Sequence, residues 1–151
     1  PQPERQELVD WLASKAPGEA SQGELMMRTD QVRQLYDNGM EIGGHTVTHP
    51  ILASITDQQA KDETAQGRQR LEEITGDEVR VFAYPNGKPG QDYLPRHREM
   101  VKNLGFKAAV STCWGVSTAE TDPFQLHRFT PWDNSPTRFM LRLIRNYYQQ
   151  E

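Results

Sequence analysis

Short runs of β-branched and aromatic residues alternate with helix-like segments in this chain, and this alternation restricts the fold more than any other feature. The clearest strand is 79-VRVFAYP-85, and 106-FKAAVST-112 is a second, mostly apolar strand. A helical segment from about 95 to 104, closed by Gly105, separates the two. Strands that alternate with helices over short connections favour parallel pairing, with the helices packed outside the sheet.

Helical periodicity and capping signals predict four more helices. They are expected over 4–16, over 30–38 with Thr29 as N-cap, from Thr56 to Gly76, and over 136–148. The apolar residues of the last helix are expected to face inward, namely Phe139, Met140, Leu143, Ile144 and Tyr147. Short strands are expected over 40–42 and 125–129. His97, among charged neighbours on a helix, is expected to be solvated.

The length of the chain limits how much of an α/β fold it can build. With 151 residues it is expected to form a single domain, over 1–151. A complete (β/α) barrel of eight units needs about 250 residues. The sequence, with three or four strands, therefore predicts either a small open α/β sheet or a partial or distorted (β/α) barrel.

Composition excludes several classes of function. The net charge of −4, with both signs interspersed, argues against a nucleic-acid-binding surface. The single cysteine, Cys113, excludes a disulfide framework and a cysteine-based zinc site. The sequence contains no apolar run of membrane-spanning length and no visible signal peptide, and it leaves the cellular compartment open.

Two histidines, His45 and His49, lie four residues apart in 41-EIGGHTVTHP-50. On a helical turn, side chains at this spacing share a face and can converge on one metal ion. On an extended strand they would lie about 13 Å apart, and convergence would fail. The two glycines before His45 favour a sharp turn, whereas Pro50 biases His49 away from helix. Spacing alone leaves a metal site and a pair of ordinary loop histidines both open.

Two motifs in this order resemble the NodB-type polysaccharide deacetylases, the carbohydrate esterases of family four. The run 41-EIGGHTVTHPIL-52 is similar to their H-[ST]-x-x-H metal motif, and 80-RVFAYPNG-87 is similar to a variant of their third motif. The resemblance extends over roughly residues 25–133. It implies that His45 and His49 are ligands of a divalent metal, which we expect to be zinc, in a (β/α) barrel of the NodB type.

The chain departs from the family pattern in two ways. Family members carry an earlier Thr-Phe-Asp-Asp-Gly run, which supplies the catalytic base and an aspartate as third metal ligand. This sequence has no such run and no Asp-Asp pair, and it begins with Pro1 rather than Met. Ala83 stands where many members have an arginine that orients the base. We therefore expect the chain to be the C-terminal portion of a deacetylase catalytic domain.

The resemblance implies a hydrolase of carbohydrate metabolism that removes N-acetyl groups from N-acetylglucosamine-containing polysaccharide. The metal would make hydroxide available near neutral pH, and this would attack the acetamide carbonyl. The backbone N–H of Asn86 is the expected oxyanion donor, and His127 is the expected general acid for the leaving amine. Tyr84 and Trp114 are candidates for binding sugar, although each could equally be a core or anchoring residue.

A second reading belongs to a different class of function. Without the aspartate pair, the chain could be a catalytically inactive domain that binds a glycan or a partner protein and retains relic histidines. A missing first strand would also leave an unpaired parallel edge, through which copies could associate. The resemblance favours a location at the bacterial envelope.

Overall fold

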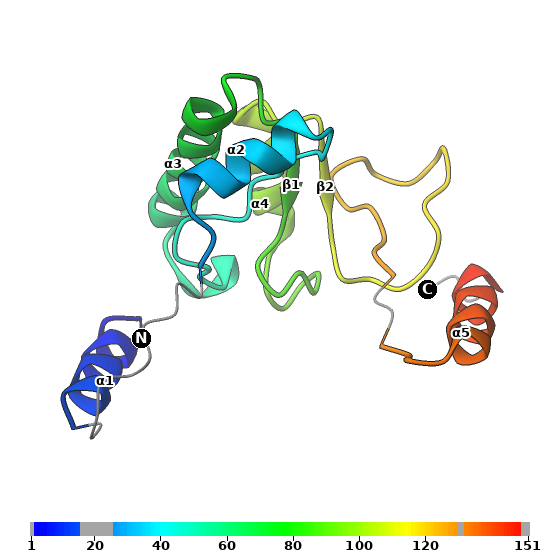
Figure 1. The fold of residues 1–151 in the computed structure, drawn as a ribbon, viewed down its shortest axis with the longest axis horizontal. Helices are drawn as coiled ribbons and strands as arrows, with labels where there is room; N and C mark the ends of the chain where they lie inside the picture. The colour runs from blue at the N-terminus through cyan, green and yellow to red at the C-terminus, as the bar shows by residue number, and fades with distance from the viewer. Residues whose placement is uncertain (1, 16–25, 130–131, 149–151) are drawn as a thin grey trace.

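The computed structural model describes residues 2–15, 26–129 and 132–148 (Figure 1). Their elements follow the predicted alternation of helices and strands. In chain order they are α1 (Gln2–Lys15), α2 (Thr29–Asp37), the 3₁₀ turn η1 (Leu52–Ser54), α3 (Asp57–Thr75), β1 (Val81–Ala83), α4 (Pro95–Asn103), β2 (Ala108–Val110) and α5 (Pro136–Tyr148). The described part of the chain is thus mixed α/β, as predicted.

The sheet is built from parallel segments. β1 and β2 pair in parallel, with Phe82 opposite Ala109. Single parallel bridges add one segment on each side, through Gly44 next to Phe82 and through Leu126 next to Val110. The spatial order is therefore the Gly44 segment, β1, β2 and the Leu126 segment. Within the described residues this is an open array rather than a closed barrel.

The strands expected over 40–42 and 125–129 do not form as such. The first segment pairs with β1 at Gly44, whose N–H donates to Val81 and whose carbonyl accepts from Ala83, and residues 40–42 are not part of the ladder. The second pairs with β2 at Leu126, and the carbonyl of Pro123 accepts from Ala109. Proline has no N–H, so it cannot donate a ladder bond in return. Both predictions were wrong in extent.

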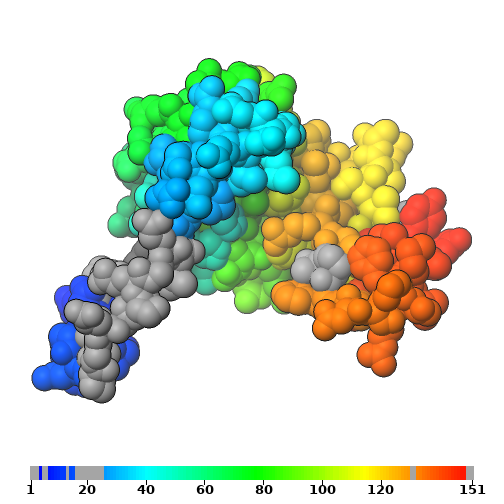
Figure 2. Space-filling model, in the orientation of Figure 1, coloured from blue at the N-terminus to red at the C-terminus, as the bar shows by residue number. Residues whose placement is uncertain are grey.

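Aromatic and aliphatic side chains between the sheet and the helices form the core. Phe82 of β1 lies at its centre, with the rings of Tyr84 and Phe106 each 5.3 Å from its own. The helical layer contributes Leu52, Ala60 and Val101 to the same core. α3 contacts both α2 and α4, and this layer covers the parallel segments. Figures 1 and 2 show α1 and α5 at the two ends of the molecule, away from this core.

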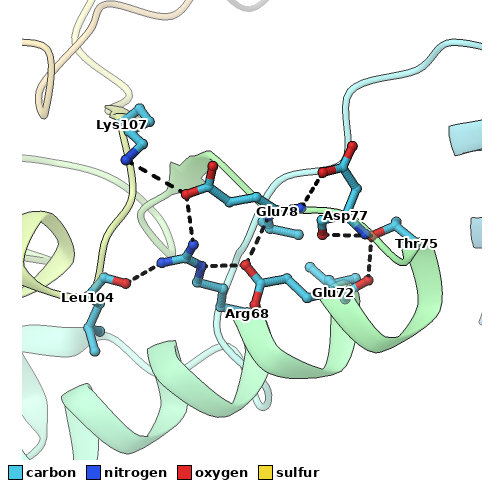
Figure 3. Close-up of polar contacts among 9 residues, drawn as sticks. Arg68, Glu72, Thr75, Asp77, Glu78, Leu104 and Lys107 are labelled. Carbon is cyan, nitrogen blue, oxygen red and sulfur yellow. Dashed lines mark hydrogen bonds and ion pairs between the residues drawn. The ribbon is translucent and has the colours of Figure 1, made fainter.

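Arg68 joins the C-terminal half of α3 to the elements around it (Figure 3). Its Nε–H donates to Glu72 over 2.7 Å, and a terminal N–H donates to the carbonyl of Leu104 after α4. Glu72 also accepts from the N–H of Val79, just before β1, and Glu78 pairs with Arg68 over 3.3 Å. The network fixes α3 against both the sheet and α4.

Helix caps were predicted with mixed success. Thr56 and Gln59 form the predicted capping box of α3, and Gly76 ends the helix in the left-handed conformation, with a φ of 71°. Thr29, in contrast, is the first residue of α2 rather than its N-cap. The cap is Arg28, whose N–H donates to the side chain of Gln31 over 2.8 Å.

Two predictions of burial were wrong. His97 is 1 % exposed, because its Nδ1 accepts from the N–H of Leu94 and caps the start of α4 inside the protein. Burial lowers the pKa of this imidazole. On α5 the buried residue is Asn146, whereas four of the five apolar side chains expected to face inward, Met140, Leu143, Ile144 and Tyr147, are exposed.

A candidate metal centre at the carboxyl edge of the sheet

The four parallel segments bring the candidate site residues to one edge. His45 follows Gly44 directly, Asn86 lies in the turn after β1, and His127 follows Leu126. Since the segments run in the same direction, their carboxyl ends share one edge, which is where ligand sites of parallel α/β folds gather. The topology therefore supports grouping these residues at one edge of the sheet.

His45 and His49 converge. The centroids of their rings lie 4.7 Å apart, with an angle of 71° between the ring planes. The chain achieves this by a tight turn in which Thr46 and His49 both have positive φ, 64° and 57°. A positive φ is unusual for any residue with a side chain, and especially for a β-branched threonine. The extended alternative, with about 13 Å between the histidines, is excluded.

The His45 ring is held by the end of β1. Its Nδ1 lies 2.7 Å from the carbonyl oxygen of Ala83, at the end of β1. A carbonyl oxygen only accepts, so Nδ1–H is the donor in this contact, and a neutral ring would carry its lone pair on Nε2. This is the arrangement in which a histidine ligand is typically held, with one ring nitrogen donating to a backbone carbonyl and the other directed at the metal. Both His45 and His49 are exposed to solvent.

Glu63 on α3 anchors the turn between the histidines. Its carboxylate accepts from the N–H groups of Val47 and Thr48, over 2.9 and 2.8 Å, and from the Thr48 hydroxyl over 2.9 Å. Gly67, one turn further along α3, allows the backbone of Thr46 to approach closely. A Cβ at Gly67 would lie 3.1 Å from the Thr46 carbonyl carbon and oxygen.

Neither Glu63 nor Gly67 was identified as a site residue from the sequence. Glu63 lies 14 positions beyond His49 on a helix rich in other acidic residues, and no motif separates it from them. Gly67 fits the helical apolar pattern, so its role as a contact point for a loop could not be read from periodicity.

Replacing Glu63 by alanine is expected to weaken zinc binding about 10- to 100-fold, with both histidines still present. The loss of three hydrogen bonds frees the turn that holds the two rings together. Residues that position metal ligands without binding the metal themselves typically contribute about 10- to 100-fold to metal affinity. Isothermal titration with zinc measures the effect, and Asp62→Ala, on an exposed carboxylate of the same helix, is the matched control. Equal zinc affinities for the two variants would show that Glu63 does not position the site.

The donor set is incomplete in the part of the chain that the structure describes. There, no group of three or more His, Cys, Asp or Glu side chains could hold a metal ion. This agrees with the missing aspartate pair in the sequence. The two imidazoles fit zinc by donor type and by convergence, and a zinc ion held there would need further ligands.

Asn86 lies in a pinned turn after β1. It has a positive φ of 58°, the N–H of Gly87 donates to Pro85 over 2.7 Å, and the N–H of Thr112 donates to Gly87 over 2.8 Å. The N–H of Asn86 itself has no hydrogen-bond partner among the described residues, and the residue is exposed. A fixed, unused donor at this edge suits the role expected of an oxyanion donor.

Tyr84 belongs to the core. It is 1 % exposed, its ring is stacked on that of Tyr93 at 3.8 Å, and its hydroxyl donates to the carbonyl of Phe124. Burial raises the pKa of its phenol. A ring covered in this way cannot stack on a sugar, so its assignment as a substrate-binding residue was wrong. The core alternative is the correct one.

His127 follows a segment of the parallel array that is not adjacent to the one that leads to His45. The Nδ1 of His127 is 3.4 Å from the Ser117 hydroxyl, and its ring packs against Gly115. In the spatial order of the parallel segments, that of His127 is three positions from that of His45, which corresponds to about 14 Å in a flat sheet. One acetamide can therefore reach both histidines only if the array curves. Trp114 is half-buried, with Arg142 5.8 Å from the centre of its ring.

Comparison with known proteins identifies the family. The sequence profile described as "Polysaccharide deacetylase" matches residues 11–109, about two thirds of the chain. The chain belongs to the polysaccharide deacetylase family. This confirms the resemblance that the two motifs indicated.

Individual relatives of this deacetylase-family chain are distant and longer. The putative polysaccharide deacetylase YxkH of Bacillus subtilis is 23 % identical over 99 residues, which cover 66 % of this chain and 34 % of that protein. The Streptococcus pyogenes deacetylase PplD, solved in complex with acetate, is 22 % identical with a TM-score of 0.69 and covers 77 % of this chain. The Bacillus cereus polysaccharide deacetylase BC0361 is also 22 % identical, with a TM-score of 0.67 over 82 % of this chain.

The chain spans only part of the length of these proteins, 50 % of PplD and 38 % of BC0361. At this level of identity the structural likeness shows a shared fold. Among the described residues, no helix is long and apolar enough to cross a membrane.

Proposed function

We propose that this chain forms part of a metal-dependent deacetylase that hydrolyses the acetamide of N-acetylglucosamine units in a polysaccharide. His45 and His49 are two of its metal ligands. The observation that carries the proposal is the orientation of the pair, with rings 4.7 Å apart and the Nδ1–H of His45 held by the Ala83 carbonyl. Ordinary loop histidines would not need this shared direction or the two positive φ angles that produce it.

The candidate site residues have separate tasks in this scheme. His45 and His49 would hold a divalent metal, zinc by ligand type, which when bound would supply a water of lowered pKa near neutral pH. The Ala83 carbonyl and Glu63 keep His45 and His49 convergent. The N–H of Asn86 stabilises the negative charge that develops on the acetamide oxygen. His127 donates a proton to the leaving amine nitrogen, provided that the sheet brings it near.

The third protein ligand and the catalytic base are expected to be aspartates outside the described residues. The family resemblance implies these aspartates, and among the described residues no carboxylate joins the two imidazoles in a group that could hold a metal ion. The chain by itself should therefore bind zinc weakly and release little or no acetate.

A chimera tests the proposed function. The part of the Bacillus cereus deacetylase that precedes its matching region is joined to this chain, and acetate release from N-acetylglucosamine oligosaccharides is measured with zinc. We expect the chimera to release acetate, and the same chimera with His45→Ala to release none. A chimera that folds and binds zinc but leaves the oligosaccharide intact would contradict the proposal.

The incomplete donor set also supports a second candidate, a catalytically inactive domain that binds glycan. Binding of N-acetylglucosamine oligosaccharides to this chain, measured by titration calorimetry with and without a chelator, separates the two. Binding that is unaffected by chelation and by His45→Ala favours the inactive domain, because a relic site has no need of its metal.

A further inference from the structure

Three helices in the described part of the chain begin with the same hydrogen bond, and one of them makes it with a residue that can titrate. In α2 and α3 the third residue is a glutamine, Gln31 or Gln59, whose side-chain oxygen accepts from the N–H of the residue before the helix, over 2.8 and 3.0 Å. In α4 this place belongs to His97, whose Nδ1 accepts from the N–H of Leu94 over 3.2 Å. A glutamine amide can accept at any ordinary pH, whereas an imidazole accepts only while its ring is neutral.

His97 is shielded from water, and its second ring nitrogen is left without a partner. The residue is 1 % exposed, whereas Gln59 is exposed and Gln31 is half-buried. Because Nδ1 accepts, the proton of the neutral ring is on Nε2, and this N–H has no hydrogen-bond partner among the described residues. The carboxylate of Asp57, at the start of α3, lies 3.7 Å from Nε2, which is beyond hydrogen-bond distance. A second proton on this ring would therefore break one hydrogen bond without forming another.

Charged side chains of both signs face the ring from α3 and α4. Asp57 would attract an imidazolium, but its carboxylate already accepts from the Nε–H of Arg96 over 2.7 Å, and Arg96 repels a second cation. Lys61 and Glu99, one charge of each sign, line the same open groove of about 560 Å³ beside the ring. With two charges of each sign, burial has the largest effect, and it lowers the pKa of His97.

We propose that His97 is a pH-sensitive latch, which holds the start of α4 while its ring is neutral and releases it when the ring takes up a proton. In the imidazolium both nitrogens donate, so Nδ1 can no longer accept from the N–H of Leu94. The groove gives the charged ring a path toward Asp57 and solvent. The first turn of α4 then loses its capping bond. The latch lies outside the candidate metal site and does not depend on the proposed function.

The connection that the latch holds also supports the segment after the histidine pair. The carbonyl of Asp92, two residues before Leu94, accepts from the N–H of Ala53 in η1 over 2.9 Å. η1 begins three residues after His49. Release at Leu94 is therefore expected to loosen η1 as well.

Proton uptake sets the direction of the pH effect. In the unfolded chain His97 has the ordinary histidine pKa of about 6.5, and in the folded chain its pKa is lower. Below about pH 6.5 the unfolded or released state binds more protons than the latched state. The contribution of the latch is therefore fully present above that pH, and it is lost as the pH falls through the lowered pKa.

Amide hydrogen exchange of the whole chain, followed by NMR between about pH 7.5 and pH 5.5, tests the proposal. We expect the protection factor of the Leu94 amide to fall at least about threefold over this range, and that of Ala53 to fall with it. His97→Gln is the matched variant, because it keeps the type of capping bond that Gln31 and Gln59 make but cannot titrate. Its Leu94 protection factor should change by less than about 1.5-fold, although the other histidines still titrate.

Two results would overturn the proposal. One is a Leu94 protection factor that stays constant over the range, or that falls as much in His97→Gln, because the release would then not depend on His97. The other is nitrogen NMR of the unmodified chain that finds the His97 proton on Nδ1 at neutral pH, since this nitrogen could not then accept from Leu94. The second measurement needs no substitution, so it decides the question even if the variant fails to fold.

Discussion

Zinc binding by this chain is expected to weaken at least about 100-fold when His45 or His49 is replaced by alanine. Each histidine supplies one of two imidazole donors, and no third donor among the described residues could take its place. Both side chains are exposed, so the substitutions should cost little stability. Isothermal titration with zinc, together with circular dichroism, measures the two effects separately.

His127→Ala is the matched control for this experiment. Its segment lies three steps away from that of His45 in the parallel array, so its loss should leave zinc affinity unchanged. If His127→Ala weakened zinc binding as much as His45→Ala, the ion would be bound elsewhere or the array would be curved enough to bring all three histidines together.

Replacing Phe82 by alanine is expected to lower the free energy of unfolding by about 3–5 kcal/mol. Phe82 is 1 % exposed and contacts the rings of Tyr84 and Phe106, so the change leaves a cavity in the centre of the core. It also removes the side chain against which Gly44 packs, directly before His45. Zinc affinity should therefore fall along with stability.

Urea denaturation measures the Phe82→Ala effect, and Tyr148→Ala is the control. Tyr148 is also aromatic but is 79 % exposed, so its loss should change the free energy of unfolding by less than about 0.5 kcal/mol. A loss of under about 1 kcal/mol for Phe82→Ala would mean that the core is centred elsewhere.

The sequence predicted those parts of the fold that depend on short-range signals. The capping box of Thr56 and Gln59 and the left-handed Gly76 define α3 locally, without reference to the rest of the chain. The parallel order of β1 and β2 followed from the helix between them, because a strand–helix–strand unit leaves the chain running in the same direction. These predictions needed no knowledge of tertiary contacts.

Features set by tertiary contacts were missed. His97 has charged neighbours in sequence, yet its ring turns inward to cap α4. The apolar side of α5 was assigned to the core by its periodicity, but periodicity identifies an apolar side without saying what covers it. The helix is instead attached through a buried asparagine, Asn146, whose partner Gly115 is 31 residues away in sequence.

The sequence identified the candidate ligands, whose role stays a prediction, but it did not identify the residues that support them. The spacing of His45 and His49 fitted two conformations, and the motif resemblance together with the turn at Thr46 decided between them. Glu63 holds that turn from a different element, and nothing in the local sequence identifies it. Tyr84, in a motif next to the site, proved to be buried because odd and even positions at a strand end face opposite sides.

X-ray absorption spectroscopy of the zinc-loaded chain tests the central claim most directly, because it counts the imidazoles bound to the ion. We expect scattering from two imidazole rings at about 2.0–2.1 Å, with oxygen atoms completing the coordination. The His45→Ala variant, at a zinc concentration that loads it, should show one. Fewer than two imidazoles in the unmodified chain, or an unchanged spectrum for the variant, would contradict the assignment of His45 and His49 as a ligand pair.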